Sequence, residues 1–166
     1  MVDPHDGSAE EARPPTLDDL LGLCRNLNEA GAKYIVVGGM AVIQHGFVRA
    51  TEDIDLLVDA SAENQQKIRA ALEQLPDAAI REMAADDLDR YVVVRVADEF
   101  VVDLMKAACG VEYDEAREQI MRVEIKDVVI PFASRELLWR LKQTQREKDV
   151  LDRQFLRQLM DGEPEA

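Results

Sequence analysis

Residues 34–58 of this chain read YIVVGGMAVIQHGFVRATEDIDLLV, and no other segment constrains the fold as much. The apolar run Tyr34–Val37 predicts a strand, and the run Ile54–Val58 predicts a second strand that starts among carboxylates. Those carboxylates, Asp53 and Asp55, are two residues apart and should point to the same face of the strand. Two like charges side by side raise each other's pKa unless a cation neutralises them. The pair therefore predicts a site for a divalent metal ion, and the alternative is a solvated strand start, where acidic residues are common.

A glycine pair, Gly38 and Gly39, directly follows the first predicted strand. Glycine lets backbone N–H groups approach a phosphate closely, and phosphate beside metal-binding carboxylates indicates nucleotide chemistry. The same two glycines also fit a plain tight turn from strand to helix. Phosphate binding and the turn are compatible, so both interpretations stay open at this point.

The remaining pattern predicts an α/β (α+β) domain with a mixed sheet flanked by helices and a short C-terminal helical segment. Helices are expected over residues 17–30, 40–44, 61–75, 113–120, 134–143 and 147–160. Strands are expected over residues 34–37, 54–58, 91–96, 100–105, 122–125 and 128–130, the last closed by Pro131. Residues 80–90 are ambiguous and suggest a short strand followed by an acidic loop. We divide the chain into an acidic flexible tail (1–15), a core (16–132), C-terminal helices (133–160) and a second tail (161–166).

The composition limits the classes of function. The 166 residues are 47% hydrophobic, which suits one globular domain, and no apolar run of about 18 residues predicts a membrane span. The N-terminal segment has no basic region followed by an apolar core, so we expect no secretory signal and a cytoplasmic protein. Cys24 and Cys109 lack metal-knuckle spacing and are expected to be free thiols.

The net charge argues against a long nucleic-acid partner. The chain has 20 Lys and Arg against 34 Asp and Glu, which gives a formal charge of −14. A field of that sign repels phosphate backbones, although a local basic groove remains compatible with it. The charge slightly favours a small or cationic partner.

A third carboxylate, Asp103, lies in the apolar run Phe100–Met105. Alternation along a strand places it on one face with Val101 and Met105. A buried carboxylate is unfavourable unless it is paired or binds metal. If this strand lies beside the one that starts at Asp53, the three carboxylates meet and can hold one or two Mg²⁺ ions. The alternative is a charge at the edge of a strand.

These motifs, in this order, resemble a known family. The glycine pair, the segment RATEDIDLLV (49–58) and the segment VVDL around Asp103 are similar to the nucleotidyltransferase fold of the DNA polymerase beta-like superfamily. Within it, the chain most resembles small bacterial proteins related to abortive-infection toxin nucleotidyltransferases, with lincosamide and aminoglycoside nucleotidyltransferases as more distant relatives. The toxin-like branch adds a C-terminal pattern, which is matched here by Lys142, Arg146, Lys148, Asp149 and Asp152. The resemblance covers roughly residues 16–159. Many family members carry a serine where this chain has Gly39.

The resemblance implies roles for particular residues. Asp53, Asp55 and Asp103 would be catalytic and would bind Mg²⁺, with Asp103 completing the metal site or acting as general base. The implied nucleotide-binding residues are Gly38, Gly39, Arg49, Lys142, Arg146 and Lys148. For Arg49, a surface position or an ion pair with a carboxylate is left open. For the C-terminal cluster, the alternative is a solvated helix face with salt bridges, because Lys142 and Arg146, and Lys148 and Asp152, are spaced i, i+4.

The implied function is Mg²⁺-dependent transfer of a nucleoside monophosphate from a nucleoside triphosphate, such as ATP, to an acceptor hydroxyl on RNA, tRNA or protein. A toxin–antitoxin or phage-defence setting, with a cognate partner protein, follows from the same resemblance. Two alternatives stay open: a catalytically silent binding or regulatory subunit, and an adenylyltransferase of small molecules such as antibiotics. The acceptor, the preferred base and the oligomeric state do not follow from the sequence.

Overall fold

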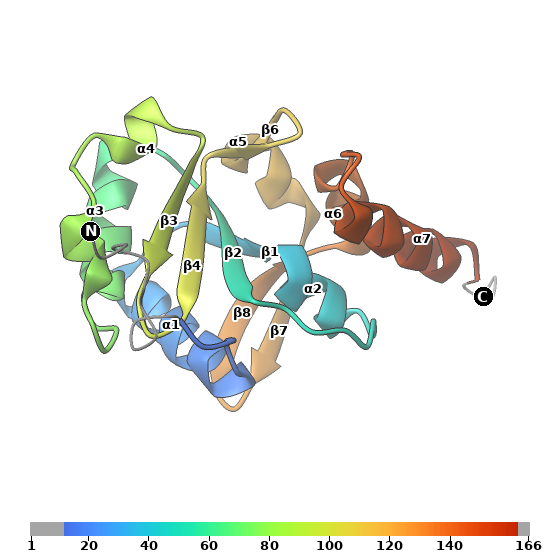
Figure 1. The fold of residues 1–166 in the computed structure, drawn as a ribbon, viewed down its shortest axis with the longest axis horizontal. Coiled ribbons are helices and arrows are strands. Elements are labelled where there is room, and N and C mark those ends of the chain that lie inside the picture. The colour runs from blue at the N-terminus through green and yellow to red at the C-terminus, as the bar shows by residue number, and fades with distance from the viewer. Residues whose placement is uncertain (1–11, 163–166) are drawn as a thin grey trace, which may run out of the picture.

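The computed structural model describes residues 12–162, and a six-stranded mixed sheet forms its centre (Figure 1). The predicted tails, residues 1–15 and 161–166, lie largely outside the described residues. The order of the strands in the sheet is β3-β4-β2-β1-β8-β7. These strands are β1 (Tyr34–Val37), β2 (Asp53–Val58), β3 (Val93–Ala97), β4 (Val101–Met105), β7 (Ile120–Ile125) and β8 (Val128–Ala133). A separate two-stranded sheet consists of β5 (Ala107–Ala108) and β6 (Val111–Glu112).

Helices surround this sheet (Figure 1). The α-helices are α1 (Leu17–Ala30), α2 (Gly38–Gln44), α3 (Ala62–Leu72), α4 (Asp87–Arg90), α5 (Tyr113–Ala116), α6 (Arg135–Leu141) and α7 (Glu147–Asp161). Two 3₁₀ turns, η1 (Ala79–Glu82) and η2 (Arg117–Gln119), complete the elements. The fold class predicted from the sequence is confirmed. Within residues 12–162, no helix combines the length and the apolar character needed to cross a membrane.

Helix α1 begins and ends where its sequence predicts. The Thr16 hydroxyl accepts the backbone N–H of Asp19, and the Asp19 carboxylate accepts the backbone N–H of Thr16, which is a capping box. Gly31 ends the helix in the left-handed conformation, with φ of 72°. Arg13 joins the N-terminal end of α1 to the β3–β4 turn, because it forms ion pairs with Asp19 and Glu99.

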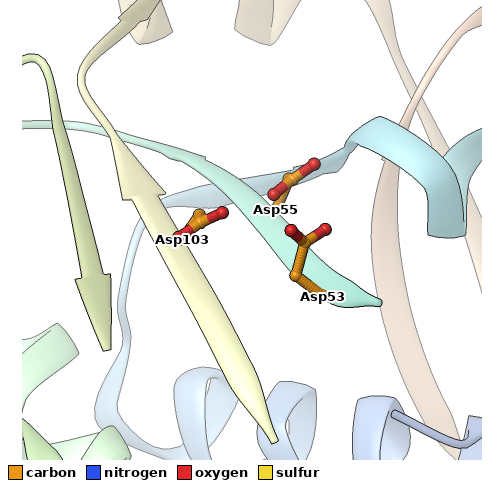
Figure 2. A group of neighbouring side chains, drawn as sticks. All are labelled: Asp53, Asp55 and Asp103. Carbon is orange, nitrogen blue, oxygen red and sulfur yellow. The ribbon is translucent and has the colours of Figure 1, made fainter. Parts of the chain in front are cut away.

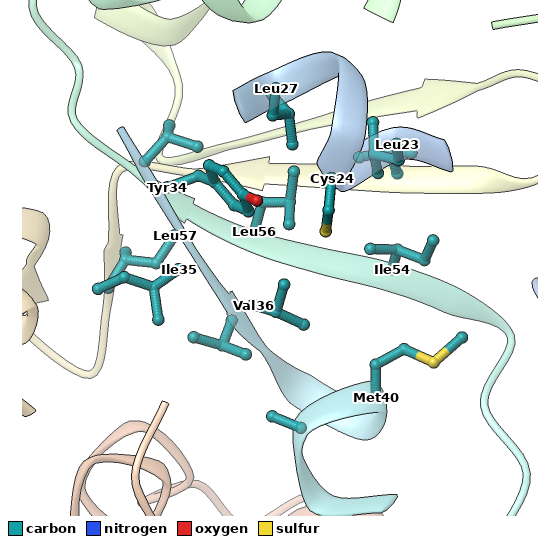
Figure 3. Close-up of a cluster of buried hydrophobic side chains, with 14 of the residues drawn as sticks. Leu23, Cys24, Leu27, Tyr34, Ile35, Val36, Met40, Ile54, Leu56 and Leu57 are labelled. Carbon is teal, nitrogen blue, oxygen red and sulfur yellow. The ribbon is translucent and has the colours of Figure 1, made fainter. Parts of the chain in front are cut away.

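The hydrophobic core fills the space between α1 and one face of the sheet. In Figure 3, Leu23, Cys24 and Leu27 of α1 face Ile54 and Leu56 of β2. All five are essentially inaccessible to solvent. Because side chains alternate along β2, burying Ile54 and Leu56 on this face turns Asp53 and Asp55 to the opposite face. The core therefore fixes the direction in which the carboxylates point.

The strand pairing confirms the central expectation about the sheet. β2 runs antiparallel to β1 and parallel to β4, and the β2–β4 register places Asp55 directly beside Asp103. The hairpin predicted around residues 97–99 is present as β3 and β4.

Two local predictions were wrong. Residues 80–90 form no strand; they contain part of η1 and all of α4, because Arg69 of α3 donates hydrogen bonds to the carbonyls of Ile80 and Met83 and holds the segment in turns. Pro131 does not close the second hairpin, since β8 continues to Ala133. The register carries β8 past the proline, with Pro131 opposite Arg122 and Phe132 paired with Val36 of β1.

Candidate active site

Three carboxylates converge on one face of the sheet, as the sequence predicts. Asp53 and Asp55 extend from β2 and Asp103 from the neighbouring strand β4, and their side chains point toward one another (Figure 2). One oxygen from each carboxylate lies within 4.8 Å of the others. The parallel pairing of β2 with β4 produces this arrangement, since it brings together residues that are 48 positions apart, from Asp55 to Asp103. We call Asp53, Asp55 and Asp103 the carboxylate triad.

The triad carries negative charge that the protein compensates only in part. Burial, followed by the charges of Asp53 and Asp103, raises the pKa of Asp55 to about 7. Burial and the neighbouring Asp103 also raise the pKa of Asp53. Oxygen ligands from carboxylates are those that Mg²⁺ prefers, and an ion here would relieve the repulsion. The residues of the triad therefore fit the divalent metal that their spacing predicts.

The glycine turn is packed against the triad. Gly38 has φ of +65°, and a Cβ atom there would lie 2.0 Å from Oδ2 of Asp55. A Cβ on Gly39 would lie 2.5 Å from the Thr51 hydroxyl. Both positions thus need glycine to let the start of α2 approach the carboxylates. The Thr51 hydroxyl therefore lies beside Gly39, although sequence reasoning did not select this residue.

Arg95 is a further residue that sequence reasoning missed. Its Nε lies 2.9 Å from Oδ1 of Asp103, its Nη2 lies 3.0 Å from Oδ2 of Asp103, and Nη2 is also 3.4 Å from Oδ2 of Asp53. These bonds, above all those to Asp103, raise the pKa of Arg95. A signal existed in the sequence, because the β3–β4 hairpin pairs Arg95 with Asp103 and opposite charges are favourable at such positions.

Besides Arg95, four basic side chains line one cavity together with the triad, and this cavity has a volume of about 500 Å³. They are the predicted nucleotide-binding residues Arg49, Lys142, Arg146 and Lys148. The structure therefore brings the glycine turn, the carboxylate triad and all four predicted cations to one cavity. Apolar side chains form another part of its wall: Val93, Met105, Ala107, Ala108, Cys109, Leu138 and Leu141.

The C-terminal cluster is not the solvated helix face that its spacing allowed. Lys142 and Arg146 do not share a helix, because α6 ends at Leu141 and α7 begins at Glu147. Lys142, Asp149 and Asp152 are buried, with exposed fractions of 6%, 3% and 0%. The partners of Asp152 are Lys142 and Arg49 rather than Lys148. This also answers the open question about Arg49, which pairs with a carboxylate.

Asp149 supports the loop between α6 and α7. Its carboxylate accepts hydrogen bonds from the Thr144 hydroxyl and from Arg146 Nε, the latter at 3.1 Å. Burial alone would raise the pKa of Asp149, but these bonds and the charges of Lys142 and Arg146 lower it overall. Arg153 of α7 donates to the carbonyls of Lys142 and Thr144, so the loop backbone is held as well.

A family of known proteins matches this chain. The model of a family described as nucleotidyltransferases of unknown function (DUF6036) matches residues 16–136, which is most of the chain. The chain belongs to this nucleotidyltransferase family. No curated protein gives a match.

Solved structures show that this nucleotidyltransferase shares its fold with others. A candidate nucleotidyltransferase from Thermotoga maritima, TM1012, superposes with a TM-score of 0.57 at 16% identity, over 93% of this chain and 98% of that one. The lincosamide antibiotic adenylyltransferase LnuA, solved with lincomycin bound, gives a TM-score of 0.57 at 17% identity, over 87% of this chain and 98% of that one. At these identities the likeness concerns the fold. The loop at 142–146 and helix α7 lie beyond the segment that the family model matches.

Proposed function

We propose that this nucleotidyltransferase is Mg²⁺-dependent and moves a nucleoside monophosphate from a nucleoside triphosphate to an acceptor hydroxyl. The observation that carries the proposal is the carboxylate triad, which shares one cavity with four basic side chains. Anionic and cationic groups side by side suit a metal–triphosphate complex, since the carboxylates bind the metal and the cations bind phosphate oxygens.

The carboxylate triad would bind the metal and accept a proton. Asp53, Asp55 and Asp103 would hold Mg²⁺, which when bound neutralises phosphate charge. Asp103 lines the same cavity beside Asp55 and would also accept the proton of the acceptor hydroxyl. The acceptor oxygen forms a bond to the α-phosphorus, the bond between that phosphorus and the bridging oxygen breaks, and pyrophosphate leaves.

The other side of the cavity supplies phosphate ligands. Gly38 and Gly39 let the backbone approach a triphosphate, and Arg49, Lys142, Arg146 and Lys148 supply positive charge for its oxygens. Positive charge that is in place before binding stabilises the pyrophosphate that leaves.

Thermal unfolding with Mg²⁺ and each of the four nucleoside triphosphates tests the proposal. A ligand that binds only the folded state stabilises it, by about 2.7 kcal/mol at 100 times its Kd. We expect an increase in melting temperature that requires both metal and nucleotide. No shift with any of the four would favour the silent binding subunit instead.

The acceptor is tested separately. Labelled nucleotide is incubated with total RNA, with cell protein, and with lincosamides or aminoglycosides. The formal charge of −14 favours a small or cationic acceptor over a long polyanion, and LnuA is named for transfer to a lincosamide. Label on RNA would support the setting of toxin and cognate antitoxin, and label on an antibiotic would support a resistance enzyme.

A further inference from the structure

Asp152 lies behind the wall of the cavity and has no contact with the cavity itself. Its side chain is completely buried on α7, and it is absent from the residues that line the cavity. Its Oδ2 accepts a hydrogen bond from Arg49 Nη2 at 2.9 Å and lies 2.8 Å from Lys142 Nζ. One carboxylate oxygen thus holds two cations, and both cations line the cavity.

The two cations come from distant parts of the chain. Arg49 lies in the loop between α2 and β2, and Lys142 follows the end of α6. Arg49 Nη2 is also close to the glycine turn, since a Cβ on Gly39 would lie 3.1 Å from it. Through its contacts with Arg49 and Lys142, Asp152 therefore links the loop beside the glycine turn to the C-terminal helices.

Stability alone does not account for this arrangement. Buried ion pairs are weak evidence for stability, because removing charges from water offsets their attraction. In addition, Arg49 Nε and Asp152 Oδ1 are both buried and have no hydrogen-bond partner within residues 12–162. Arg49 Nη2 and Lys142 Nζ, by contrast, are both held in place by Asp152 Oδ2.

The charges also fail to cancel. Arg49 and Lys142 carry two positive charges, and Asp152 carries one negative charge that both share. Asp149 contributes at a longer distance, 3.6 Å from Lys142 Nζ, and bonds mainly to Arg146 and Thr144. Without Asp152 the two cations would repel each other and move apart.

We propose that Asp152 is a positioning residue that holds Arg49 and Lys142 beside the glycine turn, in the geometry that binds the triphosphate. This proposal rests on the proposed function. It assigns a role to a residue that touches neither nucleotide nor metal, and it makes α7 part of the phosphate site.

The test compares two ligands of the same site. Asp152→Asn keeps the size of the side chain and removes its charge. With inorganic triphosphate and Mg²⁺ as the probe, we expect the Kd measured by calorimetry to rise about tenfold or more. The Kd for Mn²⁺ alone, which reports the triad, should stay within about twofold. A general loss of structure would weaken both.

Asp98→Asn is the matched control. Asp98 is also a buried carboxylate, 3% exposed, but it accepts backbone N–H groups of Asp77, Ala79 and Glu99 outside the cavity. We expect this variant to lose stability and to keep wild-type binding of both probes. If Asp152→Asn does not fold, Asp152→Glu retains the charge and displaces the carboxylate by one methylene group. It should still weaken triphosphate binding.

The outcomes separate this proposal from the proposed function. Wild-type triphosphate affinity in a folded Asp152 variant overturns the positioning role and leaves the proposed function intact. A wild-type protein that binds neither triphosphate nor Mn²⁺ overturns both. As a further check, Asp152→Asn should have less effect in an Arg49→Gln background than in the wild type, and equal effects would contradict action through Arg49.

Discussion

The two sides of the cavity hold their charges in different ways. On the sheet side, two of the three carboxylates, Asp53 and Asp103, pair with one arginine, Arg95, whose side chain is 62% exposed. On the helical side, Lys142, Asp149 and Asp152 are paired at almost complete burial. Burial and the repulsion among the triad's carboxylates raise the pKa of Asp55, whereas Lys142, Asp149 and Asp152 pair opposite charges.

This difference indicates that the carboxylate triad binds a ligand, whereas Asp149 and Asp152 support the cations around them. A set of like charges without enough counter-charge is stabilised when a ligand of opposite sign binds to it. Buried ion pairs fix the positions of their members, and the positive charge that Asp152 leaves uncompensated on Arg49 and Lys142 lies at the cavity. The sheet side therefore suits a metal ion that arrives with its substrate, and the helical side suits a preformed phosphate site.

The largest effect is expected from removing two carboxylates of the triad. Asp53→Ala combined with Asp55→Ala should lower transfer activity by on the order of 10³-fold or more, because the metal loses two of its three ligands. The far-ultraviolet circular dichroism spectrum should be unchanged. Asp77→Ala combined with Asp86→Ala removes the same charge from two exposed positions and should retain activity. Retained transfer in the Asp53 and Asp55 variant would refute the metal assignment.

Replacing one aspartate on each side should change stability in opposite directions. Since burial and its neighbours raise the pKa of Asp55 to about 7, its ionisation destabilises the metal-free fold as pH rises from about 4 through 7. Asp55→Asn should therefore raise the free energy of unfolding at pH 8 by on the order of 3 kcal/mol, with the gain vanishing near pH 4. Asp152→Asn should lower it by about 3 kcal/mol, because two buried cations lose their partner.

Urea unfolding in the presence of a chelator measures both variants at several pH values. Mg²⁺ should stabilise the wild type at pH 8 and have little effect on Asp55→Asn. Equal and pH-independent changes for the two variants would contradict the distinction between the two sides.

Replacing Arg95 should have a smaller effect, which concerns metal binding. Because it pairs with Asp103 and Asp53, it competes with a metal ion for the same oxygens. Arg95→Ala should tighten Mn²⁺ binding in the absence of nucleotide by roughly 3- to 10-fold, a modest range because the side chain is largely exposed. Titration calorimetry measures it, with the exposed Arg81→Ala as the charge-matched control. Weaker Mn²⁺ binding would show that Arg95 organises the triad rather than competing for it.

The smallest effect is expected at Lys148, an exposed basic residue that lines the cavity. Lys148→Ala should weaken the binding of inorganic triphosphate by less than about threefold, because exposed charges are screened by water and salt. The loss should decrease further between 50 mM and 500 mM salt. A larger loss that does not depend on salt would indicate direct contact with the ligand.

The sequence predicted the sheet side better than the helical side. Asp53, Asp55 and Asp103 could be placed because strand alternation and hydrophobic runs are local signals, and one parallel pairing completed the triad. Arg95 was within reach of the same reasoning through the register of its hairpin. The cluster around Asp152 was not, because the i, i+4 interpretation of Lys142 and Arg146 ignored the break between the helices predicted over 134–143 and 147–160. The tertiary contact with Arg49, 103 residues away, leaves no local pattern in the sequence.

The parallel pairing of β2 with β4 also has a kinetic consequence. The β3–β4 hairpin is local and can form early, but docking it on β2 closes a loop of more than 40 residues between Asp55 and Asp103. The register sets like charges directly opposite each other, which opposes that step at neutral pH. Refolding should therefore be faster when protons or Mg²⁺ neutralise the facing carboxylates. The carboxylates that we propose as the metal site thus also oppose one step of folding.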